Sequence, residues 1–411
     1  MTTEVSGDSK NSTRRVIGLI SAGHFLSHFY LLLLPPLFPL LRDVYGVGYT
    51  QLGLAITAFS VVTALTQAPI GFLVDRYGAR TILVAGILLE AIAFIGIGIW
   101  PVYGALIGFM MLAGLANSVY HPADYAILNA SVDPARMGRA FSIHTFAGYL
   151  GNATAPVTMI FLASLFDWRV GVIVCGAFGG VVGVLIALNS SVLRDAAPAS
   201  SGGSAEADGT GRRGMALLFS GPVMLGLLFF VGIAITGGGF SGFTVAVLDA
   251  LRGMDLKDAG FVLSVFLFAG PVGVLSGGWV ADRIAHHARF TAVCFVLVAC
   301  AAVLIATVEL PYALLVIVFM LAGFFSGAVA PSRDMMIRAL APPGEMGKVF
   351  GFVSTGFNIG SMVAPVLFGY LLDQSQPQGV FWVVAVVSLL TVGTVLATGG
   401  RPSRAVTPAR A

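Results

Sequence analysis

Charged residues are scarce in this sequence of 411 residues: Asp, Glu, Lys and Arg make up 10% of it, whereas hydrophobic residues make up 57%. The mean hydropathy is +0.93. A water-soluble domain with this composition would expose large apolar patches. The composition therefore excludes an ordinary soluble protein and predicts an integral membrane protein.

The sequence also lacks the motifs of common enzyme chemistry. It has no Gly-Lys-Ser/Thr phosphate loop, no nucleophile elbow and no zinc-spaced pair of Cys or His residues. The three cysteines, Cys175, Cys294 and Cys300, fall inside apolar runs and are interpreted as structural filler. Neither an ATP-driven pump nor a hydrolase has support, so we expect no enzyme activity, no cofactor and no metal.

Long apolar runs cover most of the chain. Each reaches the roughly 20 residues that a helix needs to cross a hydrocarbon core of ~30 Å. We therefore expect an all-α integral membrane protein with twelve transmembrane helices, spans 1 to 12, in two six-helix bundles. The twelve runs lie at residues 16–41, 50–73, 81–100, 104–130, 140–165, 170–190, 215–248, 258–281, 288–309, 312–340, 347–371 and 379–399.

The positions of Lys and Arg predict the orientation, because basic loops stay cytoplasmic. With the N-terminus inside, seventeen of the 22 Lys and Arg residues fall on cytoplasmic loops and tails, against four on the opposite side. We expect a multi-pass protein of the inner (cytoplasmic) membrane with both termini in the cytoplasm. The net charge of +3 reflects this topology and gives no ground for nucleic-acid binding.

Composition also suggests the domain boundaries. Residues 191–214 are rich in Gly, Ser and Ala, which is typical of a flexible linker. We expect a cytoplasmic tail at 1–14, a bundle at 15–190, this cytoplasmic linker at 191–214, a second bundle at 215–399 and a cytoplasmic tail at 400–411.

The two halves of the chain repeat each other. Residues 137–157 return 209 positions later as residues 346–366, and residues 71–76 return 207 positions later as residues 278–283. Two homologous halves in a very apolar chain are typical of a transporter whose halves rock about a central site. The identical positions of the longer repeat are Met137, Gly138, Phe141, Gly151, Ala155, Pro156 and Val157.

A ten-residue motif lies between spans 2 and 3. It reads Gly71-Phe-Leu-Val-Asp-Arg-Tyr-Gly-Ala-Arg80 and resembles the loop signature of the major facilitator superfamily, Gly-x-Leu-x-Asp-Arg-x-Gly-x-Arg. In that family the Asp, here Asp75, engages the start of span 11 and holds the cytoplasmic gate. The alternative is that the loop merely sets the topology. The second copy departs after Arg283 and lacks the later Gly. The predicted gating residues are Gly71, Asp75, Arg76, Arg80, Asp282 and Arg283.

A narrower resemblance rests on about forty residues of the first half. Tyr120-His121-Pro122 in span 4, Gly138-Arg-Ala-Phe-Ser, and the spacing of Gly148, Gly151 and Pro156 resemble the fosmidomycin-resistance group of exporters. The Gly-Pro-x-x-Gly-Gly element of drug antiporters is incomplete in span 5. This departure weakens the assignment to drug efflux.

Histidines on span 1 are the first candidate for chemistry inside the membrane. Ser21, His24 and His28 share one helical face, with both histidines near mid-span. An imidazole there can gain or lose a proton near neutral pH, which suits proton coupling or binding of an acidic substrate. The alternative is that each histidine is structural and bonds to a neighbouring helix.

Opposite charges occupy positions that the repeat equates. Asp124 of span 4 shares a face with Asn117 and His121, beside Pro122, and falls on Arg333 of span 10 under the offset of 209. Spans 4 and 10 lean toward each other on the cytoplasmic side in the major facilitator superfamily, so the resemblance implies that Asp124 and Arg333 pair across the halves when that side closes. Alternatively, Arg333 pairs with Asp334 or holds an anionic substrate.

Polar residues on other spans complete the predicted pathway. His144 and Asn152 of span 5, Gln67 of span 2 and Asn358 of span 11 each lie on a polar or small-residue face, whereas Gly148 and Gly151 are interpreted as packing contacts. We expect residues 236–239 to loosen span 7 into a discontinuous helix. Glu90 of span 3 is either a proton carrier or a structural contact, and the second is favoured because span 3 is peripheral in this fold.

These observations predict a monomeric secondary transporter that works by alternating access and exports a small amphiphilic or anionic compound in exchange for protons. One alternative is proton-coupled uptake of an organic anion. Another is a membrane receptor or partner protein without transport, but such a protein would not need costly buried charges on spans 1, 4, 5 and 10. The predicted substrate and proton pathway comprises His24, His28, Gln67, His121, Asp124, His144, Asn152, Arg333 and Asn358.

Overall fold

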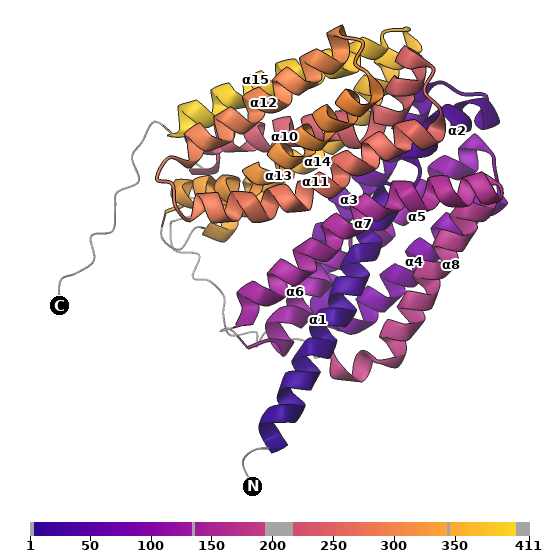
Figure 1. Ribbon diagram of the computed structural model, residues 1–411. Helices are drawn as coiled ribbons and strands as arrows, with labels where there is room; N and C mark the ends of the chain where they lie inside the picture. Colours follow the sequence, from indigo (N-terminus) through magenta and orange to yellow (C-terminus); the bar gives the residue numbers. More distant parts are fainter. Residues whose placement is uncertain (1–3, 134–135, 194–216, 343–345, 400–411) are drawn as a thin grey trace. The chain divides into compact units, whose positions relative to one another are not determined.

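The structure is a computed structural model that describes residues 4–133, 136–193, 217–342 and 346–399. Every regular element within these residues is a helix (Figure 1). Twelve helical segments are long and apolar enough to cross a membrane. The prediction of twelve spans is therefore confirmed, and the observed bounds differ from the predicted ones by a few residues.

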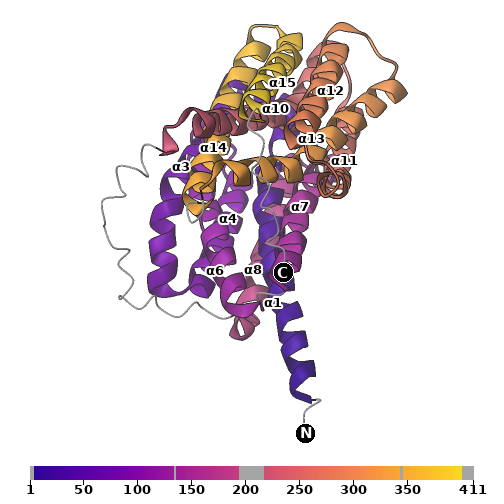
Figure 2. The same cartoon turned by 90° about the vertical axis from the view of Figure 1, so that its left-hand side faces the viewer.

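The helices of the first half follow one another with short connections. They are α1 (Glu4–Leu31), η1 (Pro35–Leu37), α2 (Phe38–Tyr45), α3 (Tyr49–Tyr77), α4 (Ala79–Ile99), α5 (Tyr103–Asn117), α6 (Tyr120–Ser131), α7 (Met137–Leu165), α8 (Trp168–Leu188) and η3 (Ser190–Val192). The second half contains α10 (Gly221–Arg252), α11 (Leu256–Ala281), α12 (His287–Thr307), α13 (Tyr312–Leu340), α14 (Met346–Asp373) and α15 (Pro377–Gly399). Figure 2 gives a second view of the same helices.

Span 4 is interrupted, and span 7 is not. Span 4 consists of α5 and α6, which are separated by Ser118 and Val119. Pro122 lies in the first turn of α6, where a missing N–H costs little. The expected break at residues 236–239 is wrong, because α10 runs unbroken from Gly221 to Arg252. Its small residues admit neighbouring helices instead, as where Gly238 faces Ala364.

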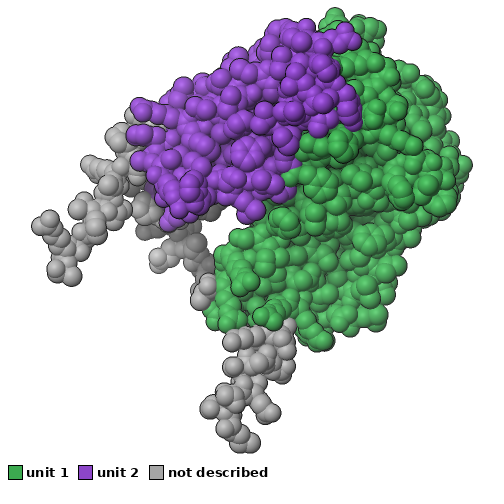
Figure 3. All heavy atoms as spheres, in the orientation of Figure 1, with its two compact units in different colours: residues 1–205, 238–268, 362–380 green, residues 206–237, 269–361, 381–411 purple. Residues whose placement is uncertain are grey.

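The chain forms two compact units, which Figure 3 colours separately. Unit 1 contains residues 1–205, 238–268 and 362–380, and unit 2 contains residues 206–237, 269–361 and 381–411. The predicted linker at 191–214 falls mostly on residues 194–214, and these, like residues 400–411, lie outside the described residues.

In unit 1, small residues bring helix backbones close together. Gly151 of α7 faces the carbonyl oxygen of Phe25 on α1, which leaves no room for a side chain at that position. Gly176 of α8 similarly approaches the carbonyl of Ala91 on α4. Among the helices α1 to α8, the pairs α1 with α7 and α4 with α8 make the most extensive contacts (Figure 1).

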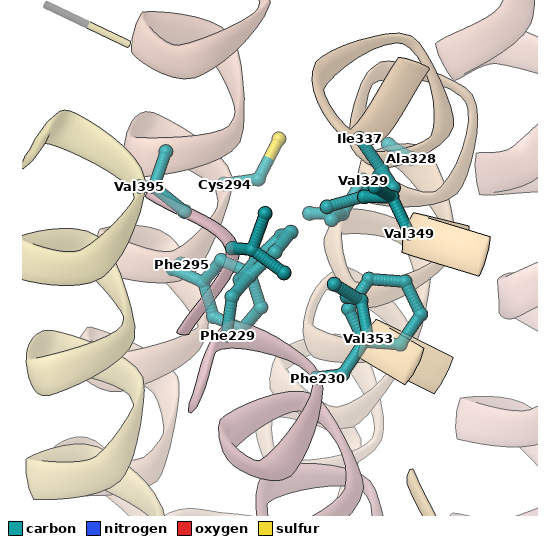
Figure 4. Packing of buried hydrophobic residues seen from close by; sticks show 11 residues of the cluster. Phe229, Phe230, Cys294, Phe295, Ala328, Val329, Ile337, Val349, Val353 and Val395 are labelled. Carbon is teal, nitrogen blue, oxygen red and sulfur yellow. The ribbon is translucent and has the colours of Figure 1, made fainter. Parts of the chain in front are cut away.

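In unit 2, a cluster of buried aromatic and β-branched side chains fills the space between helices (Figure 4). Phe229 and Phe230 of α10 meet edge to face, and Phe229 packs in the same way on Phe295 of α12. Val349 and Val353 of α14 belong to the same cluster. The cluster supplies unit 2 with an apolar core whose buried members include no Asp, Glu, Lys, Arg or His.

The loop motif shows why its two copies differ. In the first copy a single residue, Gly78, connects α3 to α4 with φ +90°, a conformation that side-chain-bearing residues rarely adopt. In the second copy the residue at the equivalent position is Ala285, and residues 282–286 connect α11 to α12. Losing the glycine is thus accompanied by a longer connection.

Asp373, the last residue of α14, caps the start of α3. Its carboxylate accepts hydrogen bonds from the backbone N–H groups of Tyr49 at 2.7 Å and Thr50 at 2.9 Å, and from the Thr50 hydroxyl at 2.6 Å. The residue at the N-cap position of α3 is Gly48, which has no side chain to do this. A helix of the second half therefore completes the hydrogen bonding of a helix of the first half.

The cap predicts a measurable contribution to stability. Asp373→Ala should lower the free energy of unfolding by about 1 kcal/mol, the typical value for a helix N-cap, and lower the unfolding temperature in detergent. Asp43→Ala is the matched control, because Asp43 is an exposed carboxylate bonded to the exposed Arg42. Equal unfolding temperatures for Asp373→Ala and Asp43→Ala would show that the cap contributes nothing.

Candidate functional site

Four of the six histidines of the chain meet inside unit 1. His24 and His28 lie one turn apart on α1, with ring centroids 4.7 Å apart. His144 of α7 stacks on His24 with centroids 3.7 Å apart and an interplanar angle of 13°, and His121 of α6 lies 5.5 Å from His24. We call these four residues together with Asp124 and Asn152 the histidine cluster.

Helical spacing explains how the rings come together. On α7, Gly148 lies one turn from His144 and leaves room for both rings of α1, because a Cβ there would lie 2.8 Å from His24 Cε1 and from His28 Cδ2. Asn152 follows one turn later and bonds to His28 Nδ1 at 3.0 Å. The predicted faces of spans 1 and 5 are therefore the faces that meet.

Hydrogen bonds define the proton positions on the two rings of α1. His24 Nδ1 lies 2.8 Å from the carbonyl oxygen of His144. A carbonyl oxygen can only accept, so His24 donates from Nδ1, and Nε2 of the neutral ring is left to accept a proton. The amide nitrogen of Asn152 donates to His28 Nδ1, which places the hydrogen of that neutral ring on Nε2.

Asp124 supplies a carboxylate beside His144. It is fully buried, and its Oδ2 lies 3.7 Å from Nε2 of His144, which is itself 2% exposed. This distance is short enough for electrostatic attraction but too long for a hydrogen bond. A small movement of α6 against α7 would bring the two groups into hydrogen-bonding contact.

Several buried polar atoms of the histidine cluster have no hydrogen-bond partner among the described residues. Such an atom usually costs about 1–3 kcal/mol, so a concentration of them suggests a function other than stability. The atoms are His24 Nε2, His121 Nδ1, both carboxylate oxygens of Asp124, both ring nitrogens of His144, and Asn152 Oδ1. Ser21 Oγ on α1 shares this property.

Imidazole and carboxyl groups this close together can take up and release protons. Among the described residues no group of three or more His, Cys, Asp or Glu side chains is arranged to hold a metal ion. Imidazole rings stacked at 3.7 Å would repel each other if both were charged, so the stack favours one added proton over two. Asp124 and His144 can pass that proton between them as their separation changes.

Comparison with known proteins identifies the family. The sequence matches the Major Facilitator Superfamily over residues 20–311 and 252–411. The chain belongs to this superfamily. It is a membrane transporter with the superfamily's fold and is not an enzyme.

Relatives and solved structures of the superfamily cover nearly the whole chain. The fosmidomycin resistance protein of Escherichia coli is 23% identical, with 97% of each chain covered. The probable sulfoacetate transporter SauU of Cupriavidus necator is 26% identical, with 88% of this chain and 87% of the relative covered. A bacterial homologue of the human lysosomal transporter Spinster, in an inward-facing, unoccupied conformation, aligns with a TM-score of 0.74 at 14% identity, covering 94% and 95% of the two chains.

The remaining predicted pathway residues of this superfamily member lie outside the histidine cluster. Gln67 is half-buried on α3. Arg333 and Asn358 belong to unit 2. Arg333 donates from Nε to Asp334 Oδ1 at 2.8 Å, and its guanidinium lies 5.3 Å from the ring of Phe230 and 5.5 Å from that of Phe357.

Of the predicted gating residues, Gly71, Asp75 and Arg76 belong to α3, Arg80 lies in the first turn of α4, and Asp282 and Arg283 directly follow α11. Asp75 is exposed, Arg76 lies over the ring of Tyr77, and Arg80 Nη1 donates to the carbonyl of Ser190 at 3.5 Å. Asp282 and Arg283 are exposed, and Arg283 packs 3.9 Å above the ring of Trp279. Their role in gating stays a prediction.

One neighbour of the site, Tyr125, was missed in the sequence, and another, Glu90, was named without its partners. The ring of Tyr125 lies 5.9 Å from that of His121 and 6.1 Å from that of His144. Its position four residues after His121 was the available signal. Glu90 accepts hydrogen bonds from Tyr120 at 2.6 Å and Asn117 at 3.3 Å, so it is a buried, bonded carboxylate rather than an isolated one.

The close packing of the histidine rings against Gly148 predicts that this position does not tolerate a larger residue. Gly148→Ala forces rigid rings apart, so we expect a destabilisation of about 1–3 kcal/mol, typical of overpacking, together with a lower transport rate. Gly108→Ala is the matched control, since nothing lies within 4 Å of a Cβ at that position. Normal unfolding temperature and transport in Gly148→Ala would contradict the described packing.

Proposed function

We propose that this chain is a proton-coupled exporter of a small amphiphilic or anionic compound. It acts by alternating access as a monomer in the inner membrane, with both termini in the cytoplasm. The observation that carries the proposal is the histidine cluster: four imidazoles and a fully buried carboxylate within the membrane-spanning helices. Ionisable groups at such depth are costly and are retained where they move protons or bind substrate.

The names of relatives favour export of an anion. The fosmidomycin resistance protein and the Streptococcus pneumoniae multi-drug resistance efflux pump PmrA, 24% identical over 376 residues, are named for resistance or efflux. SauU is named for an organic anion. Uptake of an organic anion is the second candidate, because the D-galactonate transporter of Escherichia coli is 22% identical over 357 residues.

Arg333 is the proposed contact for the anionic part of the substrate. Its guanidinium is 18% exposed and flanked by the rings of Phe230 and Phe357, an environment that suits an anion attached to an apolar group. Asp334 occupies part of its hydrogen-bonding capacity, so a bound anion would compete with that carboxylate. The alternative, a bridge from Arg333 to Asp124 in the closed state, is retained for the test below.

Gating is proposed to use helix ends. Asp373 at the end of α14 caps the start of α3, and Asp75 lies at the opposite end of α3. The family resemblance gives Asp75 the reciprocal task of holding the start of α14 on the cytoplasmic side. A carboxylate at a helix N-terminus is favourable, and the repeat places Asp282 at the position equivalent to Asp75.

The direction of transport is tested by growth. Cells with and without the gene are grown with a panel of inhibitory compounds that includes fosmidomycin. Gained resistance supports export and supplies the transported probe compound, whereas gained growth on sulfoacetate or galactonate supports uptake. No change with any compound would contradict the proposed transport of this class.

Proton coupling is tested at Asp124 and His144. In everted membrane vesicles with an imposed pH gradient, Asp124→Asn and His144→Gln should each lower accumulation of the probe compound about tenfold, equivalent to ~1.4 kcal/mol. The double variant should lose no more than either single variant, because the two groups act as one unit. Asp43→Asn, an exposed carboxylate, is the control. Full gradient-driven accumulation in Asp124→Asn would remove the carboxylate from the coupling mechanism.

Arg333→Gln separates substrate binding from gating. If Arg333 holds the anion, this variant should raise KM for anionic compounds about tenfold and leave neutral ones unaffected, since a charged hydrogen bond contributes about 1.5–3 kcal/mol. If Arg333 instead bridges to Asp124, the swap of Asp124→Arg with Arg333→Asp should recover part of the transport lost in each single variant. That recovery would contradict the binding assignment.

Asp75→Asn tests the cytoplasmic gate. The change keeps the shape of the side chain and removes its charge, so transport should fall while expression and binding of the probe compound are retained. Asp282→Asn in the second copy of the motif is compared in parallel. Normal transport in Asp75→Asn would leave the loop with a role in topology alone.

A further inference from the structure

Glu90 joins the two parts of the broken span 4. Its Oε1 accepts from the side-chain amide of Asn117, the last residue of α5, at 3.3 Å. Its Oε2 accepts from the hydroxyl of Tyr120, the first residue of α6, at 2.6 Å. One carboxylate on α4 therefore holds the residues on both sides of the break.

The same carboxylate is linked to the histidines of α1. The amide nitrogen of Asn117 also donates to the carbonyl oxygen of Ser27 at 3.3 Å, and Ser27 lies between His24 and His28. The hydroxyl of Ser27 in turn donates to the carbonyl of His24 at 2.8 Å. The junction thus connects α1, α4, α5 and α6 at the level of the histidine cluster.

Packing at the junction leaves little freedom. Glu90 is fully buried and Tyr120 is 1% exposed. One turn before Glu90 on α4, Gly86 faces Val119, and a Cβ on Gly86 would lie 3.1 Å from the carbonyl oxygen of Ala116. The interrupted backbone of span 4 therefore rests directly on α4, where the glycine makes room for it and the carboxylate bonds to it.

We propose that Glu90 is a positioning residue that clamps the break of span 4 and so fixes His121 and Asp124 against His24 and His144. The inference rests on the proposed proton coupling for its functional consequence, but the clamp itself stands on the contacts above. The interruption ends at Val119, so α6 begins at Tyr120, immediately before His121. Without the clamp, the separation between Asp124 and His144 is no longer set.

Three variants distinguish a clamp from a proton carrier. Glu90→Leu removes both acceptors, Tyr120→Phe removes one donor, and Glu90→Gln keeps a carboxamide that can still bond but cannot carry a proton as a carboxyl group does. Ser118→Ala is the matched control, since Ser118 lies in the break and bonds to Leu115 rather than to Glu90.

The first measurement is independent of transport. Hydrogen–deuterium exchange of a peptide covering residues 115–124 in the full-length protein should be about tenfold faster in Glu90→Leu and Tyr120→Phe than in the parent, because unpaired groups favour local opening. Exchange in Glu90→Gln and Ser118→Ala should match the parent. Unchanged exchange in Glu90→Leu would overturn the clamp, whatever the protein transports.

The second measurement connects the clamp to function. Accumulation of the probe compound supplied by the growth test is recorded in everted vesicles across a range of pH. Its pH profile should change in Glu90→Leu, whereas Glu90→Gln should keep the parent profile. Loss of gradient-driven accumulation in Glu90→Gln with parental exchange would make Glu90 a proton carrier and overturn its assignment as a clamp. A third outcome is that the variants show the expected exchange differences but neither they nor the parent accumulate the compound. This result would contradict the proposed substrate class and leave the clamp supported.

Discussion

The structure depends on one constraint: inside a hydrocarbon layer, every backbone and side-chain polar group needs a partner from the protein. Helices satisfy the backbone, and the few buried polar side chains collect at helix contacts, where they can find one another. The break of span 4 shows how strict the constraint is. Where the backbone ladder stops before Pro122, the buried carboxylate of Glu90 bonds to the residues on both sides. The histidine cluster departs from this rule, with several buried polar atoms lacking partners.

Much of this arrangement was predictable because periodicity survives in the structure. Apolar runs gave the twelve spans, and the shared faces of spans 1 and 5 placed His24, His28 and His144 where they meet. A structural contact was the favoured role for Glu90, but its partners Asn117 and Tyr120 were not predictable, because sequence spacing along α4 says nothing about which residues of α5 and α6 lie opposite. The predicted break at residues 236–239 was wrong for a related reason. Glycine permits a break, but it equally permits close helix packing, and which of the two occurs depends on the neighbouring helix.

The caps and turns show the same limit of sequence reasoning. Asp373 caps α3 although it lies more than three hundred positions away in the sequence, and no local sequence pattern pairs it with Tyr49. The N-cap glycine, Gly48, was the available signal, since a helix beginning at a residue without a side chain needs a cap from elsewhere. The short turn at Gly78 is easier to relate to the sequence, because a one-residue connection with positive φ requires glycine.

The internal repeat shows what the two halves share and where the histidine cluster differs. The packing contact is kept in both copies: Gly151 faces the carbonyl of Phe25, and its counterpart Gly360 faces Val231 and Ala234, the second being the repeat equivalent of Phe25. At offset 209 the positions of His24, His121 and His144 are occupied by Ile233, Ala330 and Val353, and Asp124 is replaced by Arg333. The residues that let helices approach are thus retained, while the titratable residues differ. Under the proposed function, this divergence gives the histidine-bearing half the proton exchange and the half that carries Arg333 the contact with the anion, on a scaffold common to both.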